Sequence, residues 1–100
     1  MTRASGATPV FADIASPDRP WISAQTVEAR LTSRTRAVVV MHYGGVPAPT
    51  ADLVDLCDQR GLLLIEDAAH ALGTCYGPDA PSGWAERPIG GLGKVACFSF

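Results

Sequence analysis

Two adjacent carboxylates and a nearby histidine are the residues of this chain best suited to chemistry. The apolar run Leu62–Ile65 is followed by Glu66, Asp67, two alanines and His70. A short apolar run led by Gly61 predicts a strand that is buried on both faces of a parallel sheet. Ligands of open α/β sheets bind beyond the carboxyl ends of the strands, so we expect Asp67 to reach a bound ligand.

The alternation of side chains along a strand separates the two carboxylates. Glu66 and Asp67 are neighbours in sequence, and successive strand residues project to opposite faces of a sheet. At most one of them can therefore contact a given ligand. An alternative interpretation is that Asp67 only caps the next turn, because Asp is a preferred capping residue.

Strands and helices are predicted to alternate along the chain. Expected strands cover residues 8–14, 36–41, 62–66 and 94–100. A Gly- and Pro-rich loop, residues 77–93, precedes the last of them. Strands that alternate with helices indicate an α/β fold with a mainly parallel sheet and flanking helices.

Two helices are expected between these strands. Ser23 is suited to cap the first helix, in which Val27 and Leu31 are four residues apart on the inward face. The second helix is expected over residues 50–60 and should end at Gly61. Its inward face would carry Leu53, Val54, Leu56 and Cys57.

Composition limits the class of protein. One hundred residues with 47% hydrophobic content allow a single domain. The net charge of −2 and the lack of clustered Lys and Arg argue against nucleic-acid binding. Three cysteines without metal or redox spacing are expected to be small buried residues in a reducing compartment. With no signal peptide and no membrane-spanning run in the sequence, we expect a cytoplasmic protein without a membrane partner.

Other motifs lack the context that their function needs. Residues 91–96, Gly-Leu-Gly-Lys-Val-Ala, match part of a dinucleotide fingerprint, but they follow a loop and enter an expected strand. As a phosphate loop the same region fails, because Pro88 and Val95 replace the required Gly and hydroxyl residues. His42 and His70 have no metal-ligand spacing, so we expect no metal site and interpret them as loop or core histidines.

Five segments together carry a family pattern. They are residues 6–11 (Gly-Ala-Thr-Pro-Val-Phe), 35–40 (Thr-Arg-Ala-Val-Val-Val), 42–48 (His-Tyr-Gly-Gly-Val-Pro-Ala), 65–71 (Ile-Glu-Asp-Ala-Ala-His-Ala) and 97–100 (Cys-Phe-Ser-Phe). In this order and at these separations they resemble the DegT/DnrJ/EryC1/StrS family of sugar aminotransferases, which are pyridoxal-phosphate enzymes of the type I fold. The resemblance implies that residues 1–100 are one partial α/β domain, a fragment of the large cofactor-binding domain.

The resemblance also implies roles for four residues. Asp67 matches the residue that keeps the ring nitrogen of pyridoxal phosphate protonated, which the cofactor needs to act as an electron sink. Ala69 matches a position against the ring, where a large side chain would obstruct the cofactor. His70 matches a side chain that approaches the phenolic oxygen, the alternative being a partly buried histidine bonded to backbone. Ser99 matches a serine that contacts the cofactor phosphate.

No catalytic residue of the family is expected within this chain. The Schiff-base lysine should follow Phe100, and Lys94 aligns with a variable position. The upstream part of the phosphate site and the aromatic residue that stacks on the ring are also missing. Because the last expected strand contains Phe100, we expect the chain to be a piece of a longer protein.

The implied reaction moves an amino group from an amino acid, expected to be L-glutamate, onto a keto sugar nucleotide. The segments at 42–45 and 66–71 look most like the branch that makes 4-amino-4-deoxy sugars, including the aminoarabinose enzymes. A complete chain is expected to form a homodimer, and the fragment alone to be inactive. The alternative is a non-catalytic α/β module that binds a nucleotide or a partner protein.

Overall fold

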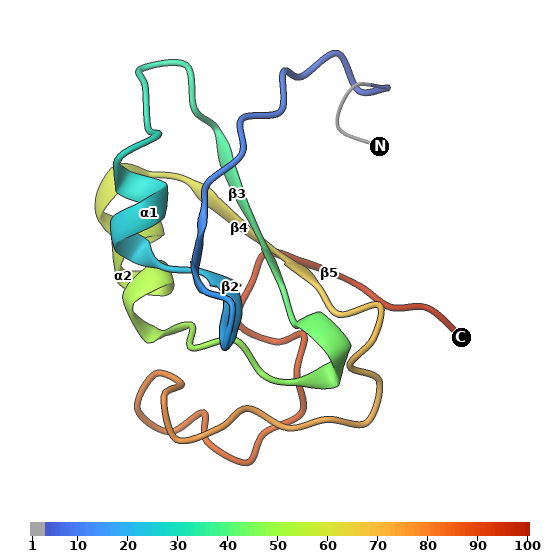
Figure 1. The fold of residues 1–100 in the computed structure, drawn as a ribbon. Coiled ribbons are helices and arrows are strands. Elements are labelled where there is room, and N and C mark those ends of the chain that lie inside the picture. Colours follow the sequence, from blue (N-terminus) through green and yellow to red (C-terminus); the bar gives the residue numbers. More distant parts are fainter. Residues whose placement is uncertain (1–3) are drawn as a thin grey trace.

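A three-stranded parallel sheet organises the computed structural model, which describes residues 4–100 (Figure 1). Its strands are β3 (Ala37–Met41), β4 (Leu63–Asp67) and β5 (Val95–Cys97), in the order β3-β4-β5. Val39 pairs with Ile65, and Ile65 with Val95. The predicted α/β fold with a mainly parallel sheet is confirmed.

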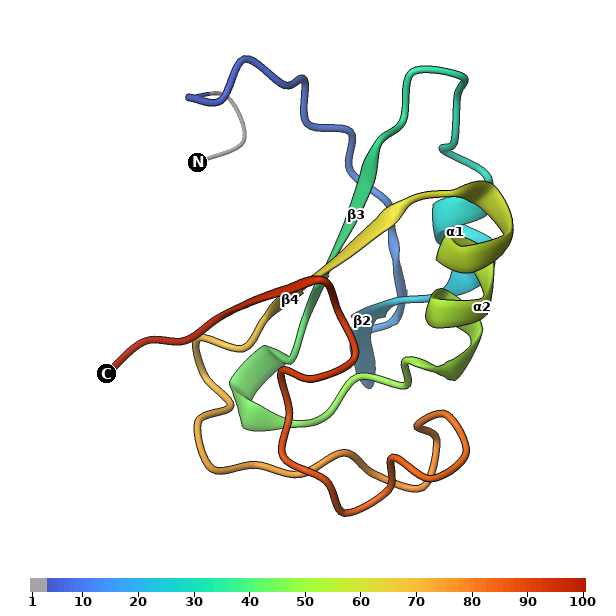
Figure 2. The same ribbon diagram turned by 180° about the vertical axis from the view of Figure 1, so that it is seen from behind.

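Two helices lie on the same side of this sheet (Figures 1 and 2). Helix α1 (Ala24–Glu28) begins at the expected cap: the Ser23 hydroxyl accepts the Thr26 N–H, and the Thr26 hydroxyl accepts the Ser23 N–H. Helix α2 (Ala51–Arg60) ends at Gly61, whose φ of 64° suits glycine. A 3₁₀ turn, η1 (Tyr43–Gly45), follows β3.

The main core fills the space between the sheet and the two helices. Strand residues with inward side chains pack against the apolar faces of α1 and α2. The fully or nearly fully buried members are Val27, Val38, Val40, Ala48, Leu53, Leu56, Cys57 and Leu64. Val54 packs against this core but is only partly buried.

The opposite face of the sheet is open among residues 4–100. Val39, Leu63 and Val95 are 49%, 51% and 54% exposed, because both helices cover the other face. The expectation that these strands are buried on both faces is therefore wrong for this chain. Since alternate residues share a face, Asp67 lies on the open face with Leu63, and Glu66 lies on the covered face.

The N-terminal part differs from the predicted strand over residues 8–14. Only its last residue is in a strand: β1 (Ile14–Ser16) pairs antiparallel with β2 (Arg19–Ile22) across a turn at Pro17 and Asp18. Pro17 and Asp18 are residue types that favour turns. Strand β2 was not predicted because it contains Pro20. Proline has no N–H to donate to a sheet and so argues against a strand in the sequence.

The last strand is shorter than expected. Residues 98–100 follow β5 without regular structure, so Phe100 does not lie in a strand. The predicted loop before it is confirmed, and it is held by a second cluster of buried residues. That cluster contains Ala68, Ala71, Tyr76 and Ile89, with Trp84 packed against it.

The three cysteines are buried only in part, although all of them were expected to be buried. Cys57 is buried and Cys97 is half-buried, but Cys75 is exposed, so burial of all three was wrong. Burial raises the pKa of the Cys57 thiol.

Among the described residues no group of three or more His, Cys, Asp or Glu could hold a metal ion. None of the helices in the described part of the chain is long and apolar enough to cross a membrane.

Thr50 offers a test of the packing at the start of α2. Its side chain is fully buried, and its hydroxyl has no hydrogen-bond partner among residues 4–100. Thr50→Val removes this unsatisfied hydroxyl at nearly constant volume, so we expect the free energy of unfolding to rise by about 1 kcal/mol. Urea unfolding would measure the change, with Thr8→Val, at an exposed position, as the control. A loss of stability in Thr50→Val alone would contradict this account.

Candidate active site

The residues singled out from the sequence meet at one edge of the sheet. His42 and the η1 turn follow β3, Asp67 ends β4, and Ser99 lies two residues after β5. The three strands are parallel and in the register Met41, Asp67, Cys97. Their carboxyl ends therefore lie together, at the edge where α/β sheets bind ligands.

Asp67 has one carboxylate oxygen in use and one available. Oδ1 accepts the Ala69 N–H at 3.1 Å, whereas Oδ2 accepts no hydrogen bond from residues 4–100. The contact to Ala69 is the kind that the capping interpretation predicts, but it occupies only one oxygen. The backbone of Asp67 is fixed as well, because its carbonyl accepts the His42 N–H at 3.0 Å. Asp67 can therefore cap the turn and still accept a proton donor from a ligand.

His70 is exposed, and its ring contacts the η1 turn. Its Nδ1 accepts the Gly44 N–H at 3.3 Å, and its ring lies edge-on to that of Tyr43 at 6.3 Å. The alternative interpretation of His70 was a partly buried histidine bonded to the backbone. The backbone hydrogen bond is present, but the side chain is exposed rather than partly buried. With Nδ1 acting as acceptor, the neutral ring carries its proton on Nε2 and can donate it to a ligand.

Ala69 and Ser99 complete the set named from the sequence. Ala69 is half-buried and bonded to Asp67, whereas Ser99 is exposed and makes no hydrogen bond to Asp67, Ala69 or His70. The Ala68 N–H donates to the Cys97 carbonyl at 2.9 Å, which joins the two strand ends. The structure therefore brings Asp67, Ala69 and His70 together and places Ser99 after the neighbouring strand.

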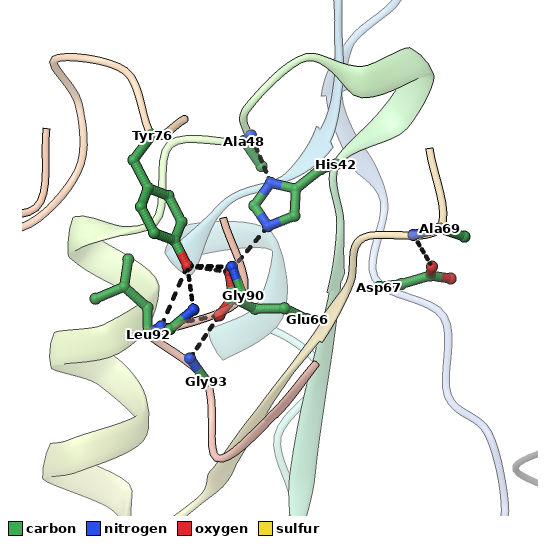
Figure 3. A network of polar contacts seen from close by, with 10 residues as sticks. His42, Ala48, Glu66, Asp67, Ala69, Tyr76, Gly90, Leu92 and Gly93 are labelled. Atoms are coloured by element: carbon green, nitrogen blue, oxygen red, sulfur yellow. Dashed lines mark hydrogen bonds and ion pairs between the residues drawn. The ribbon is translucent and has the colours of Figure 1, made fainter. Parts of the chain in front are cut away.

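Glu66 points away from Asp67 into a buried polar network (Figure 3). The side chain is fully buried, and its carboxylate accepts hydrogen bonds from four donors. At Oε2 the donors are His42 Nε2 at 3.0 Å and the Tyr76 hydroxyl at 2.6 Å. At Oε1 they are the backbone N–H groups of Leu92 at 3.0 Å and Gly93 at 2.6 Å. The expectation that the two carboxylates diverge is confirmed.

The hydrogen bonds define the donors and acceptors of this network. His42 Nδ1 accepts the Ala48 N–H at 3.1 Å, so Nε2 is the ring nitrogen that donates to Glu66. Burial alone would raise the pKa of Glu66, but hydrogen bonds from His42, Tyr76 and Gly93 outweigh it, and the pKa lies below its ordinary value. Glu66 is therefore a buried anion that is held by four hydrogen-bond donors.

Tyr76 connects this carboxylate to the following loop. Its hydroxyl oxygen accepts the N–H groups of Gly90, Gly91 and Leu92 at 2.8, 3.0 and 3.1 Å while donating to Glu66. Burial and the neighbouring Glu66 raise the pKa of the Tyr76 phenol, which therefore keeps its proton. Sequence reasoning left His42 open as a loop or core histidine, and it did not anticipate the contact of Glu66 with Tyr76. The only available signal was a carboxylate at an inward strand position.

The fold is that of an α/β protein, a class in which ligands generally bind at the carboxyl ends of the parallel strands. A sequence profile of the DegT/DnrJ/EryC1/StrS aminotransferase family matches residues 1–100. The chain belongs to this family.

Similar proteins support the same family. Spore coat polysaccharide biosynthesis protein SpsC of Bacillus subtilis is 40% identical over 96 residues, which are 96% of this chain and 22% of SpsC. Helicobacter pylori PseC, an aminotransferase involved in the biosynthesis of pseudoaminic acid, has a TM-score of 0.83 at 32% identity, covering 98% of this chain and 24% of PseC. The structure of DesI with its TDP-sugar product has a TM-score of 0.80 at 44% identity, over 98% of this chain and 23% of DesI. The chain thus spans less than a quarter of these relatives.

Proposed function

We propose that this chain is the part of a pyridoxal-phosphate-dependent sugar aminotransferase that holds the ring of the cofactor. The whole protein would transfer an amino group from L-glutamate to a keto sugar nucleotide. The observation that carries the proposal is Asp67, which presents an unused carboxylate oxygen at the ligand-binding edge of the sheet in a chain of this family. The relative DesI, whose structure holds a TDP-sugar product, supports the substrate class.

The residues at the sheet edge fit the ring of pyridoxal phosphate. When bound, the cofactor supplies an electron sink for the bond changes of transamination. Asp67 Oδ2 would hold a proton on the ring nitrogen, because a carboxylate stabilises the protonated form. Ala69 leaves space for the ring, and His70 Nε2 would donate to the phenolic oxygen. Ser99 would contribute a hydroxyl to the phosphate.

Further parts of the proposal rest on the sequence. The segments at 42–45 and 66–71 favour a 4-amino-4-deoxy sugar as the product class. We place the protein in the cytoplasm because its cysteines lack a disulfide pattern, and the resemblance to this aminotransferase family leads us to expect a homodimer. The covalent link to the cofactor is assigned to a lysine after Phe100.

The position of that lysine gives a direct test. We expect the full-length protein to retain pyridoxal phosphate through dialysis and, after borohydride reduction, to carry it on a lysine within about one helical turn after Phe100. Peptide mapping by mass spectrometry would locate the label. Lys94→Arg is the control, and it should be labelled as fully as the wild type because Lys94 is exposed and lies before Ser99. Stoichiometric label on Lys94 would contradict the site, and failure to retain the cofactor would favour a non-catalytic binding module.

A further inference from the structure

Hydrogen bonds and the backbone of the η1 turn together connect the buried carboxylate of Glu66 to the exposed ring of His70. We propose that Glu66 is a positioning residue for the cofactor site, acting through His42 and the η1 turn to keep the proton of His70 on Nε2. The inference rests on the proposed function, because it concerns the donor that His70 would offer to the cofactor.

The first step runs from Glu66 to His42. A carboxylate has only acceptor sites, and here all its bonds come from donors: His42 Nε2–H, the Tyr76 hydroxyl and two backbone N–H groups. An amide at this position would turn an N–H group toward either His42 or the backbone donors. Two donors would then face each other in a buried site, so only an ionised acid fits the arrangement.

The second step runs from His42 to the turn that follows it. The His42 ring accepts the Ala48 N–H through Nδ1, and its carbonyl accepts the Gly45 N–H at 3.2 Å. The His42 N–H in turn donates to the Asp67 carbonyl. His42 therefore joins the end of β4 to the η1 turn and to Ala48, and its ring is fully buried.

The third step runs from the turn to His70. The Gly44 N–H donates to His70 Nδ1 at 3.3 Å. Gly45, with a φ of 82°, lies so close that an added Cβ would be 2.9 Å from the His70 carbonyl oxygen. Because a neutral imidazole has one proton, a donor at Nδ1 leaves that proton on Nε2. The turn thus sets which nitrogen of His70 can donate to a ligand.

Glu66→Gln tests the path in the full-length protein. We expect the Kd for pyridoxal phosphate to rise about tenfold, which corresponds to the loss of one oriented hydrogen bond. Glu28→Gln is the matched control. It is the same chemical change, but it is made at a half-exposed ion pair with Arg60 that is not part of this path. It should change the Kd less than about twofold.

A double-mutant cycle separates positioning from mere structural support. In a His70→Gln background, residue 70 carries an amide that keeps its own N–H donors whatever the turn does. The effect of Glu66→Gln on the Kd should then shrink to less than about twofold. An undiminished tenfold effect in that background would show that Glu66 supports the site without acting through His70.

The protonated nitrogens can be read directly without cofactor. In full-length protein labelled with ¹⁵N-histidine, NMR should find the Nε2–H tautomer as the neutral form of both His42 and His70 in the wild type. Gly45→Ala should displace the turn but leave the Glu66 contacts. It should therefore populate the Nδ1–H form of His70 and leave His42 unchanged. A proton on Nδ1 in either wild-type ring, or an unchanged His70 in Gly45→Ala, would overturn the inference. This readout can therefore overturn the inference even if Glu66→Gln does not fold or the protein binds no cofactor.

Discussion

Asp67→Asn is expected to slow transamination by the full-length protein about 10- to 150-fold while the fold is retained. Asn keeps the shape of the side chain, and its oxygen can still accept the Ala69 N–H. It lacks the charge that holds a proton on the ring nitrogen. A charge-assisted hydrogen bond contributes about 1.5–3 kcal/mol, and each 1.36 kcal/mol corresponds to a factor of ten in rate.

Three measurements distinguish the roles of Asp67. Circular dichroism reports the fold, dialysis reports cofactor retention, and rapid kinetics with glutamate reports the rate of the half-reaction. Asp55→Asn is the matched control, because Asp55 is an exposed carboxylate on α2 and its loss should leave all three unchanged. Near-normal rates in Asp67→Asn would mean that Asp67 only caps the turn. Loss of the fold would mean that the carboxylate is structural.

Elements with strong local signals were predictable from the sequence. The three valines at 38–40 and the run before Glu66 gave β3 and β4 within a residue, and Gly61 marked the end of α2. Their signals are local, because apolar runs and a left-handed glycine cap depend on neighbouring residues. Ser23 was found for the same reason.

The edge that holds the site was predictable, but the network behind it was not. Asp67 and His70 follow a recognisable strand, and parallel topology then places them at the binding edge. Glu66 instead depends on His42, Tyr76 and Gly93, which are 24, 10 and 27 residues away. Nothing in a single sequence indicates which of these distant groups converge.

Burial of the sheet was overestimated for a physical reason. Apolar runs such as Leu62–Ile65 predict that both faces of a strand will be covered. Within residues 4–100 the helices cover one face only, and Leu63 stays half-exposed on the face that carries Asp67. The apolar run therefore predicts more burial for this face of the sheet than residues 4–100 provide.

Glu66→Ala is expected to lower the free energy of unfolding at neutral pH by about 3–5 kcal/mol. The substitution removes the acceptor shared by four buried donors, and breaking a buried polar pair from one side has an effect of this size. Glu28→Ala is the control, because its ion pair with Arg60 at 2.6 Å is half-exposed and should contribute less than about 1 kcal/mol. Urea unfolding would measure both, and equal small losses would contradict the assigned network.

The contribution of Glu66 should also depend on pH, with a sign that the structure defines. The pKa of Glu66 in the folded protein lies below its ordinary value of 4.5, because its hydrogen bonds outweigh the effect of burial. Its ionised form therefore stabilises the fold above pH 4.5, and this contribution is lost as the pH falls through the folded pKa. Urea unfolding repeated from neutral pH to below this range should bring the stabilities of the wild type and Glu66→Ala closer together. A difference that stays constant over the whole range would mean that the pKa of Glu66 is the same in the folded and the unfolded protein, and a difference that grows as the pH falls would mean that folding raises this pKa.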